Sequence, residues 1–96
     1  MAKTKTKKQA SFSVPVLSAK EARKLHLIKI GEIARESNLL PSTINFYTRE
    51  GLLPEDARSI GGYRLYHRER TIERLKKIQY LQNVKRFTIE EIKKIL

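Results

Sequence analysis

Four side chains in the stretch 41–54, PSTINFYTREGLLP, share one face of an expected helix and carry groups that can bind nucleic-acid bases. Ile44 and Tyr47 are spaced to enter a core, and the opposite face then holds, at helical spacing, Ser42, Asn45, Phe46 and Arg49. Asparagine can pair with adenine, arginine with guanine or a phosphate, serine with a base or the backbone, and phenylalanine with a thymine methyl group. This face predicts a reader of the major groove. The alternative is a solvated helix face.

The helix that carries these residues needs a neighbour to position it. Pro41 suits a first helical position and Gly51 a helix stop. Upstream, the segment 30–37, IGEIARES, places Ile30, Ile33 and Ala34 on one apolar face. Asn38 then suits a tight turn, and we expect the next two residues, Leu39 and Leu40, to be buried in it. Two helices separated by about four residues have the spacing of a helix-turn-helix.

A hairpin is predicted directly after this pair of helices. The segment 58–66, RSIGGYRLY, is interpreted as two short strands around a two-residue Gly61-Gly62 turn, which makes it a wing. Arg58 and Arg64 flank the turn. We expect Arg64 to contact phosphate or the minor groove, with a surface ion pair as the alternative. Tyr63 is expected to contact nucleic acid from the wing, and Tyr66 to lie in the core.

Two further helices are expected after the wing. Apolar residues recur at helical spacing from Ile72 to Leu81, and Thr88 with Glu91 forms a capping box that begins the last helix.

The N-terminal segment has a different character. Residues 1–16 alternate lysine with small polar residues and are interpreted as a disordered basic arm, whose loss the fold should survive. The arm is expected to support DNA binding through Lys3, Lys5, Lys7 and Lys8, and the alternative is a solubilising tail. Residues 17–27 are expected to form a short helix or linker, with Ser18 and Glu21 as a possible capping box.

Charge and composition narrow the function classes. A net charge of +11 and an isoelectric point near 10.2 favour a polyanion partner, nucleic acid before anionic membrane. The excess lies in residues 1–24 and 67–96, whereas residues 28–66 are balanced, so bulk charge alone does not make the middle segment a DNA reader. The absence of cysteine excludes disulfides, thiolate metal sites and thiol nucleophiles.

Nothing in the sequence indicates catalysis or a membrane anchor. There is no nucleophile–base constellation and no glycine-rich phosphate loop, so we expect no enzyme, no cofactor and no metal, with His26 and His67 as structural or surface residues. No apolar run approaches the roughly 20 residues that span a bilayer. We expect a cytoplasmic, nucleoid-associated protein.

In order and spacing, these segments resemble the winged-helix DNA-binding domain of MerR-type transcriptional regulators. The matching pieces are IGEIA at 30–34, TINFYTREGLLP at 43–54, GYRLY at 62–66 and FTIEEIKKIL at 87–96. The resemblance implies a mainly α winged helix-turn-helix over residues 28–96, in which helix 41–50 reads the major groove and wing 58–66 contacts the flanking backbone or minor groove. It implies DNA contacts from Ser42, Thr43, Asn45, Phe46, Tyr47, Arg49, Arg58, Tyr63 and Arg64. For Tyr47, the hydroxyl is expected to reach a phosphate, and the alternative is a residue wholly in the core.

The chain departs from the family pattern in ways that bear on partners. Asn45-Phe46-Tyr47 replaces the usual Arg-Tyr-Tyr, Leu40 and His67 stand where helix caps are usual, and Asn38 and Arg86 stand where glycine is common. Family members normally continue into a dimerisation helix and an effector domain. Because this chain ends at Leu96, we expect a monomer or weak dimer on double-stranded DNA, with RNA polymerase as a possible further partner. The alternatives are an excisionase-like or architectural DNA-bending protein without effector sensing, and a less specific nucleic-acid binder that uses the basic arm.

Overall fold

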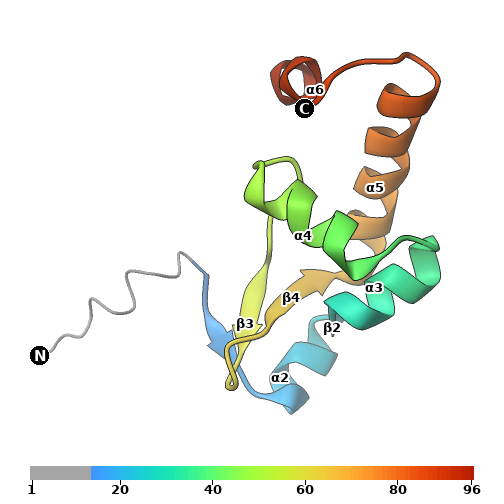
Figure 1. Cartoon of the computed structure of the whole chain (residues 1–96). Helices are drawn as coiled ribbons and strands as arrows, with labels where there is room; N and C mark the ends of the chain where they lie inside the picture. Colours follow the sequence, from blue (N-terminus) through green and yellow to red (C-terminus); the bar gives the residue numbers. More distant parts are fainter. Residues whose placement is uncertain (1–13) are drawn as a thin grey trace, which may run out of the picture.

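The computed structural model describes residues 14–96, and the basic arm predicted over residues 1–16 lies outside this range as far as residue 13, its four lysines included. The described residues form, in chain order, β1 (Val16–Leu17), α2 (Ala19–Lys24), β2 (Leu27–Lys29), α3 (Ile30–Ser37), α4 (Pro41–Arg49), β3 (Ala57–Ser59), β4 (Arg64–His67), α5 (Arg68–Asn83) and α6 (Ile89–Ile95). Figure 1 shows α4 above the strands and α3 beside β4, with α5 leading away from the sheet toward α6. The prediction of a mainly α winged helix-turn-helix is confirmed.

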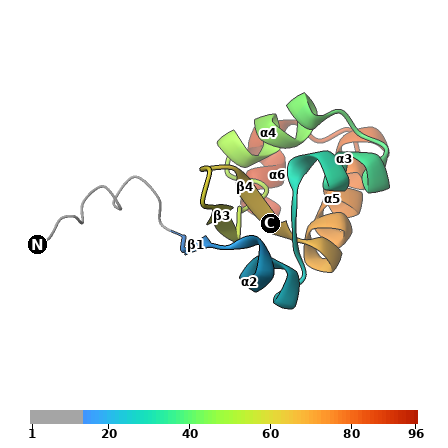
Figure 2. The same cartoon turned by 90° about the horizontal axis from the view of Figure 1, so that it is seen from below.

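The sheet separates two apolar clusters. Its strand order is β1-β3-β4-β2, in which β3 and β4 form the predicted antiparallel hairpin and β2 pairs antiparallel with β4. Successive residues of a strand face opposite sides, and in β4 the buried Leu65 and Tyr66 therefore enter different clusters. Figure 2 shows α4 and α2 on opposite sides of β3 and β4.

The larger cluster is built from the helical faces that the sequence pattern predicts. Ile33 of α3, Ile44 of α4 and Tyr66 of β4 are fully buried, as are residues of α5 and α6, including Ile78 and Ile92. Burying one such aliphatic side chain stabilises the fold by about 1.5–3 kcal/mol. This shared core fixes how α4 is rotated, and thereby which of its residues remain outside.

The helix ends follow local sequence signals, with one correction. Asn38 ends α3 in the left-handed conformation, with φ 60° and ψ 39°, and Gly51 follows α4 with φ 83°. Leu39 packs against the larger cluster, but the prediction that Leu40 is buried is wrong, because its side chain is 67% exposed. Leu40 occupies the N-cap of α4, where it offers no hydrogen-bonding side chain. Apolar character alone did not place it inside.

The wing turn also differs from the prediction. A two-residue Gly61-Gly62 turn of type I′ or II′ would need positive φ at Gly61, but of the two glycines only Gly62 has it, at 89°. The N–H of Gly62 instead donates to the carbonyl of Ser59 at 2.9 Å, and the N–H of Ser59 donates to the carbonyl of Tyr63 at 2.8 Å. The loop therefore contains three residues, 60–62, and its last position needs glycine.

The N-terminal segment is more ordered than predicted. The sequence predicts that Val16 belongs to the disordered arm, but β1 pairs parallel with β3, with Val16 opposite Arg58. The carbonyl of Pro15 accepts a hydrogen bond from Arg58 N at 2.9 Å. The arm boundary is therefore wrong for residues 14–16. The predicted Ser18–Glu21 capping box begins α2. Its hydrogen bonds from the backbone and side chain of Ser18 lower the pKa of the Glu21 carboxyl.

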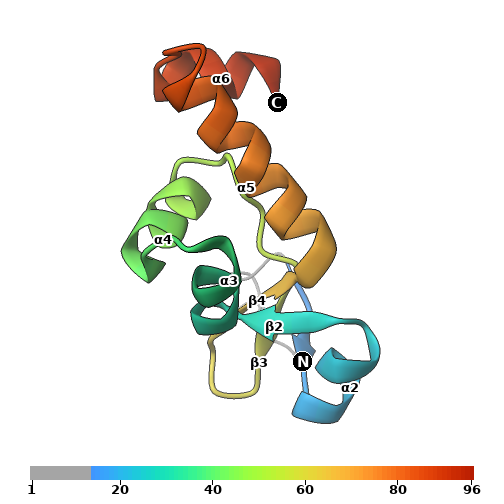
Figure 3. The same ribbon diagram turned by 90° about the vertical axis from the view of Figure 1, so that its right-hand side faces the viewer.

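The smaller cluster joins this segment to the wing. It consists of Ala22, Leu27, Ala57 and Leu65, with Leu17 packed against them. Figure 3 shows α2 and α6 at opposite ends of the molecule, with the sheet and α3 between them. Within residues 14–96, none of the helices is both long enough and apolar enough to cross a membrane.

Candidate nucleic-acid interface

The exposed face of α4 is arranged as the sequence predicts. Ile44 and Tyr47 are buried, whereas Ser42, Phe46 and Arg49 are exposed and Asn45 is half-buried. Among residues 14–96, the side chains of Ser42 and Arg49 have no hydrogen-bonding or ionic partner. Thr43 is half-buried in the same helix. The face thus offers a hydroxyl and a guanidinium whose hydrogen-bonding groups are available to a ligand.

Tyr47 belongs to the support of this face. Its hydroxyl donates to Oε1 of Gln82 at 2.7 Å and accepts from Nε2 of Gln79 at 2.7 Å, both on α5. Burial raises the pKa of the Tyr47 phenol above its ordinary value of 10.0, so the hydroxyl keeps its proton at neutral pH. The hydroxyl is directed to α5, where we had expected it to reach a phosphate. The geometry favours the alternative of a core residue.

Arg58 likewise makes bonds inside the domain. Its guanidinium bonds Glu55 through Nε at 2.7 Å and Nη2 at 3.3 Å, and Nη1 donates to the carbonyl of Gly62 at 2.9 Å. These bonds tie the start of β3 to the wing turn. The sequence predicts a DNA contact for Arg58, and this contact stays a prediction beside the bonds that the guanidinium makes within the wing.

Arg64 connects the wing to the exposed face of α4. Its Nη1 donates to Oδ1 of Asn45 at 2.7 Å, and its Nε lies 3.6 Å from Oε1 of Glu55. The ion pair with Glu55 is the alternative that the sequence left open, although at 3.6 Å Nε makes no hydrogen bond. The bond to Asn45 was not predicted, because nothing in the local sequence relates residues 19 positions apart.

A groove of about 700 Å³ lies where α3, α4 and the wing meet. The groove is lined by four basic residues and one acidic residue, Glu32. The basic residues are Lys29, Arg35, Arg58 and Arg64. The ammonium of Lys29 lies 5.1 Å from the centroid of the exposed Tyr63 ring, which is a cation–π arrangement. Sequence reasoning missed Lys29 and Arg35, since the charge balance of residues 28–66 conceals how the fold gathers basic residues on one side.

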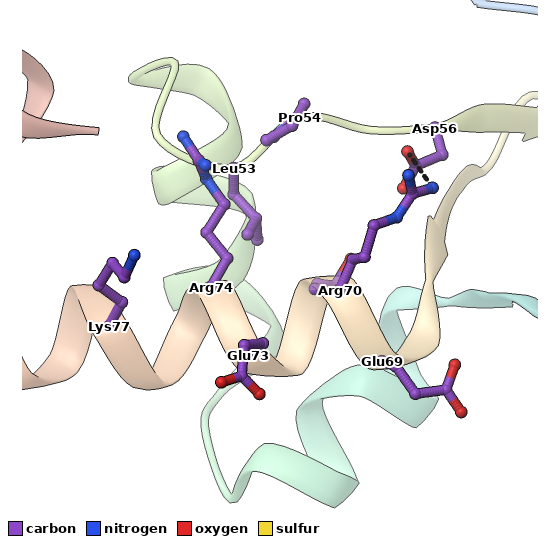
Figure 4. Close-up of a pocket in the computed structure, with 9 residues that line it drawn as sticks. Leu53, Pro54, Asp56, Glu69, Arg70, Glu73, Arg74 and Lys77 are labelled. Atoms are coloured by element: carbon purple, nitrogen blue, oxygen red, sulfur yellow. Dashed lines mark ion pairs between the residues drawn. The ribbon is translucent and has the colours of Figure 1, made fainter.

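A second groove lies between the loop after α4 and the outer side of α5, and an ion pair and hydrogen bonds join its two walls. Figure 4 shows Arg70 directed at Asp56. Nη2 of Arg70 lies 3.5 Å from Oδ1 of Asp56. Asp56 also accepts a hydrogen bond from His67 N at 2.8 Å, and Nε of Arg74 donates to the carbonyl of Leu52 at 2.6 Å. These bonds fasten the loop to α5.

His67 has a structural position, as expected. Its Nδ1 accepts from Arg70 N at 3.3 Å and caps α5. Within the part of the chain that the structure describes, no group of three or more histidine, aspartate and glutamate side chains is placed to hold a metal ion.

A helix-turn-helix followed by a β-hairpin wing, with a basic groove between them, defines a winged-helix DNA-binding domain. The chain belongs to the MerR family, since the model for MerR HTH family regulatory proteins matches residues 28–96. The family resemblance inferred from the sequence is thereby confirmed. The match begins after α2, so β1 and α2 lie outside the family domain.

Several relatives are named as regulators. The chain is 41% identical over 68 residues to the mercuric resistance operon regulatory protein of Bacillus cereus. The aligned residues make up 71% of this chain and 50% of that protein. It is 33% identical over 70 residues to the HTH-type transcriptional regulator ZntR of Escherichia coli K12, covering 73% of this chain and 48% of ZntR. The chain thus spans about half the length of these relatives.

Two solved structures are similar. The transcription regulator PbrR691 from Ralstonia metallidurans CH34, in complex with lead(II), has a TM-score of 0.62 and 41% identity, covering 71% of this chain and 52% of that one. HiNmlR, a MerR family regulator lacking the sensor domain and bound to promoter DNA, has a TM-score of 0.63 and 26% identity. The match covers 72% of this chain and 53% of the HiNmlR chain.

Proposed function

We propose that this chain binds double-stranded DNA sequence-specifically as the DNA-binding part of a MerR-type transcriptional regulator. The observation that carries the proposal is the exposed face of α4, where Ser42 and Arg49, which have no side-chain partner among residues 14–96, lie on the same helix as Asn45 at the edge of the basic groove. A helix of this width fits the major groove of B-DNA, where these side-chain types discriminate base edges. The similarity to HiNmlR, solved on promoter DNA, supports the same use of the domain.

The individual residues then have different roles. Ser42, Asn45, Phe46 and Arg49 face the bases, and Thr43 lies beside them on α4. Tyr63 and Arg64 contact the backbone or minor groove beside the wing, together with Lys29 and Arg35. Tyr47 and Arg58 hold these elements in place through their bonds to α5 and to Glu55. The lysines of the N-terminal arm add phosphate contacts whose contribution falls steeply with salt.

The same proposal covers partners and location. The domain binds DNA and catalyses no reaction, and the two relatives compared above are likewise named as regulators. Acting at promoters, it works in the cytoplasm with the nucleoid and meets RNA polymerase there. Dimerisation on DNA is tested by the symmetry of the bound site, because a dimer selects two half-sites and a monomer selects one.

Selection of bound sites from random duplex DNA tests the proposal. We expect an enriched motif for the wild type and its loss in the triple variant Ser42→Ala, Asn45→Ala, Arg49→Ala, which removes the exposed polar groups of α4 while keeping its buried face. Lys76→Ala is the matched control, since Lys76 is exposed on α5, outside the groove, and should leave the motif intact. If the wild type binds and bends DNA without any enriched motif, the regulator assignment fails and architectural binding replaces it.

A further inference from the structure

The hydrogen bond between Arg64 and Asn45 determines which way the Asn45 amide points. A guanidinium has only donors, so the amide atom 2.7 Å from Nη1 must be the oxygen Oδ1. The two amide atoms are bonded to the same carbon, and Nδ2 is therefore directed away from Arg64. In the free protein, Asn45 holds its acceptor toward the wing and has its NH₂ donors to offer a ligand.

The guanidinium of Arg64 also forms an ion pair with Glu55. Glu55 lies between two guanidinium groups, at 2.7 Å from Nε of Arg58 and 3.6 Å from Nε of Arg64. Arg58 is bonded in turn to the carbonyl of Gly62 in the wing turn. A continuous series of contacts therefore runs from the wing turn through Arg58, Glu55 and Arg64 to the exposed face of α4.

The bond to Asn45 has a distinct place in this series. Within residues 14–96 it is the one hydrogen bond that the Arg64 side chain makes, since Nε is buried without a hydrogen-bond partner. The Arg64 side chain is 27% exposed, which leaves part of the guanidinium accessible for DNA. The residue is thus able to contact DNA and to orient Asn45 at the same time.

We propose that Arg64 sets the base preference of Asn45: it occupies Oδ1, and Asn45 then donates from Nδ2 to a base with an acceptor in the major groove. The proposal rests on the proposed function, because it requires α4 to read bases. Suitable acceptors are N7 of a purine, O6 of guanine and O4 of thymine. A bidentate adenine contact would in addition need Oδ1 to accept from adenine N6 on its second lone pair, because Arg64 already holds one. Arg64 is therefore a positioning residue for specificity in addition to any phosphate contact.

The test compares variants that separate the donor at position 64 from its charge. The base pair read by Asn45 is identified as the position whose preference is lost in Asn45→Ala, and affinities are then measured for all four base pairs there. Arg64→Met removes the donor at similar length, and the ratio of best to worst affinity should fall about fivefold, the factor of one net hydrogen bond. Arg64→Lys keeps a donor and the charge and should retain most of the preference.

Two further variants complete the test. Asn45→Asp keeps an acceptor for Arg64 but has no donor, so it should lose the acceptor-bearing base and favour cytosine, whose N4 donates. Arg35→Met is the matched control, because Arg35 lines the same groove but, among residues 14–96, makes no hydrogen bond to Asn45, so the variant should weaken binding to all four duplexes alike. Thermal midpoints of all variants show that each one is folded.

The outcomes separate the two levels of the proposal. If the wild type enriches no motif, the proposed function itself fails. If the wild type enriches a motif but Arg64→Met weakens all four duplexes equally, as Arg35→Met does, sequence-specific binding stands. In that case Arg64 is only a phosphate contact, and the inference is overturned.

Discussion

The hydroxyl of Tyr47 donates a hydrogen bond to Oε1 of Gln82 at 2.7 Å and so joins α4 to α5, across 35 positions of the chain. The ring of Tyr47 is buried in the larger cluster, and the bond fixes its outer end as well. Because successive residues of a helix point about 100° apart, fixing Tyr47 inward also fixes the outward direction of its neighbour Phe46. The exposed face of α4 is thus held in position by Tyr47, which is not part of that face.

Tyr47→Phe should therefore lower stability while leaving DNA binding unchanged. The ring still fills the core, but the bonds to Gln79 and Gln82 are lost, at a cost of about 1 kcal/mol because both glutamines can turn to water. Thermal unfolding measures the first effect, and affinity for the selected duplex measures the second. A severalfold loss of affinity in a variant that is still folded would instead place the hydroxyl on a phosphate.

Leu40→Ser should stabilise the domain. Leu40 is the N-cap of α4, has no side-chain cap bond and is 67% exposed, so little apolar burial is lost on substitution. Pro41 has no N–H and Thr43 N already donates to the Leu40 carbonyl at 3.0 Å, so a serine hydroxyl would accept from Ser42 N or share Thr43 N, and should add about 1 kcal/mol. Chemical denaturation measures the gain. Leu40→Ala is the control without a hydroxyl, and an equal gain in both variants would rule out capping as the cause.

Truncation should separate the basic arm from the folded extension. Removing residues 1–13 should leave the thermal midpoint unchanged and reduce the salt dependence of DNA binding, by up to about 3–4 units of slope for four lysines. Removing residues 1–17 should also lower stability by about 1–2 kcal/mol, because β1 and the acceptor for Arg58 N are lost. Equal midpoints for the two truncations would show that β1 contributes nothing to stability.

Alkaline pH should destabilise the fold through Tyr66. Burial raises the pKa of its phenol above 10.0, against a smaller lowering by the hydrogen bond with Thr48 at 2.9 Å. The folded state therefore binds this proton more tightly than the unfolded state. Its contribution is fully present below pH 10 and is lost as pH rises from about 10 through the higher folded pKa.

Tyr66→Phe provides the comparison. The variant should be less stable than the wild type at pH 7, where only the bond to Thr48 is missing, but its thermal midpoint should fall less steeply as the pH rises above about 10. Parallel curves over that range would exclude Tyr66 as a source of the alkaline sensitivity.

Sequence alone determined the local architecture. The Ser18–Glu21 and Thr88–Glu91 capping boxes formed as predicted, and Asn38 took the left-handed conformation. These features depend on residues within three or four positions of each other, so their chemistry is complete in a short stretch of chain. The apolar faces were predictable for the same reason, because helical periodicity is itself local.

Only the tertiary structure decided how the candidate site is assembled. The Arg64–Asn45 bond, the basic groove with Lys29 and Arg35, and the pairing of β1 with β3 bring together residues that lie far apart in the sequence. Composition counted the charges of residues 28–66 as balanced, but folding turned Glu55 inward between two arginines and left basic groups around the groove. Which groups satisfy one another depends on the packing of α4, α5 and the wing. The sequence therefore determined which side chains were available, and packing decided which of them remained free to bind DNA.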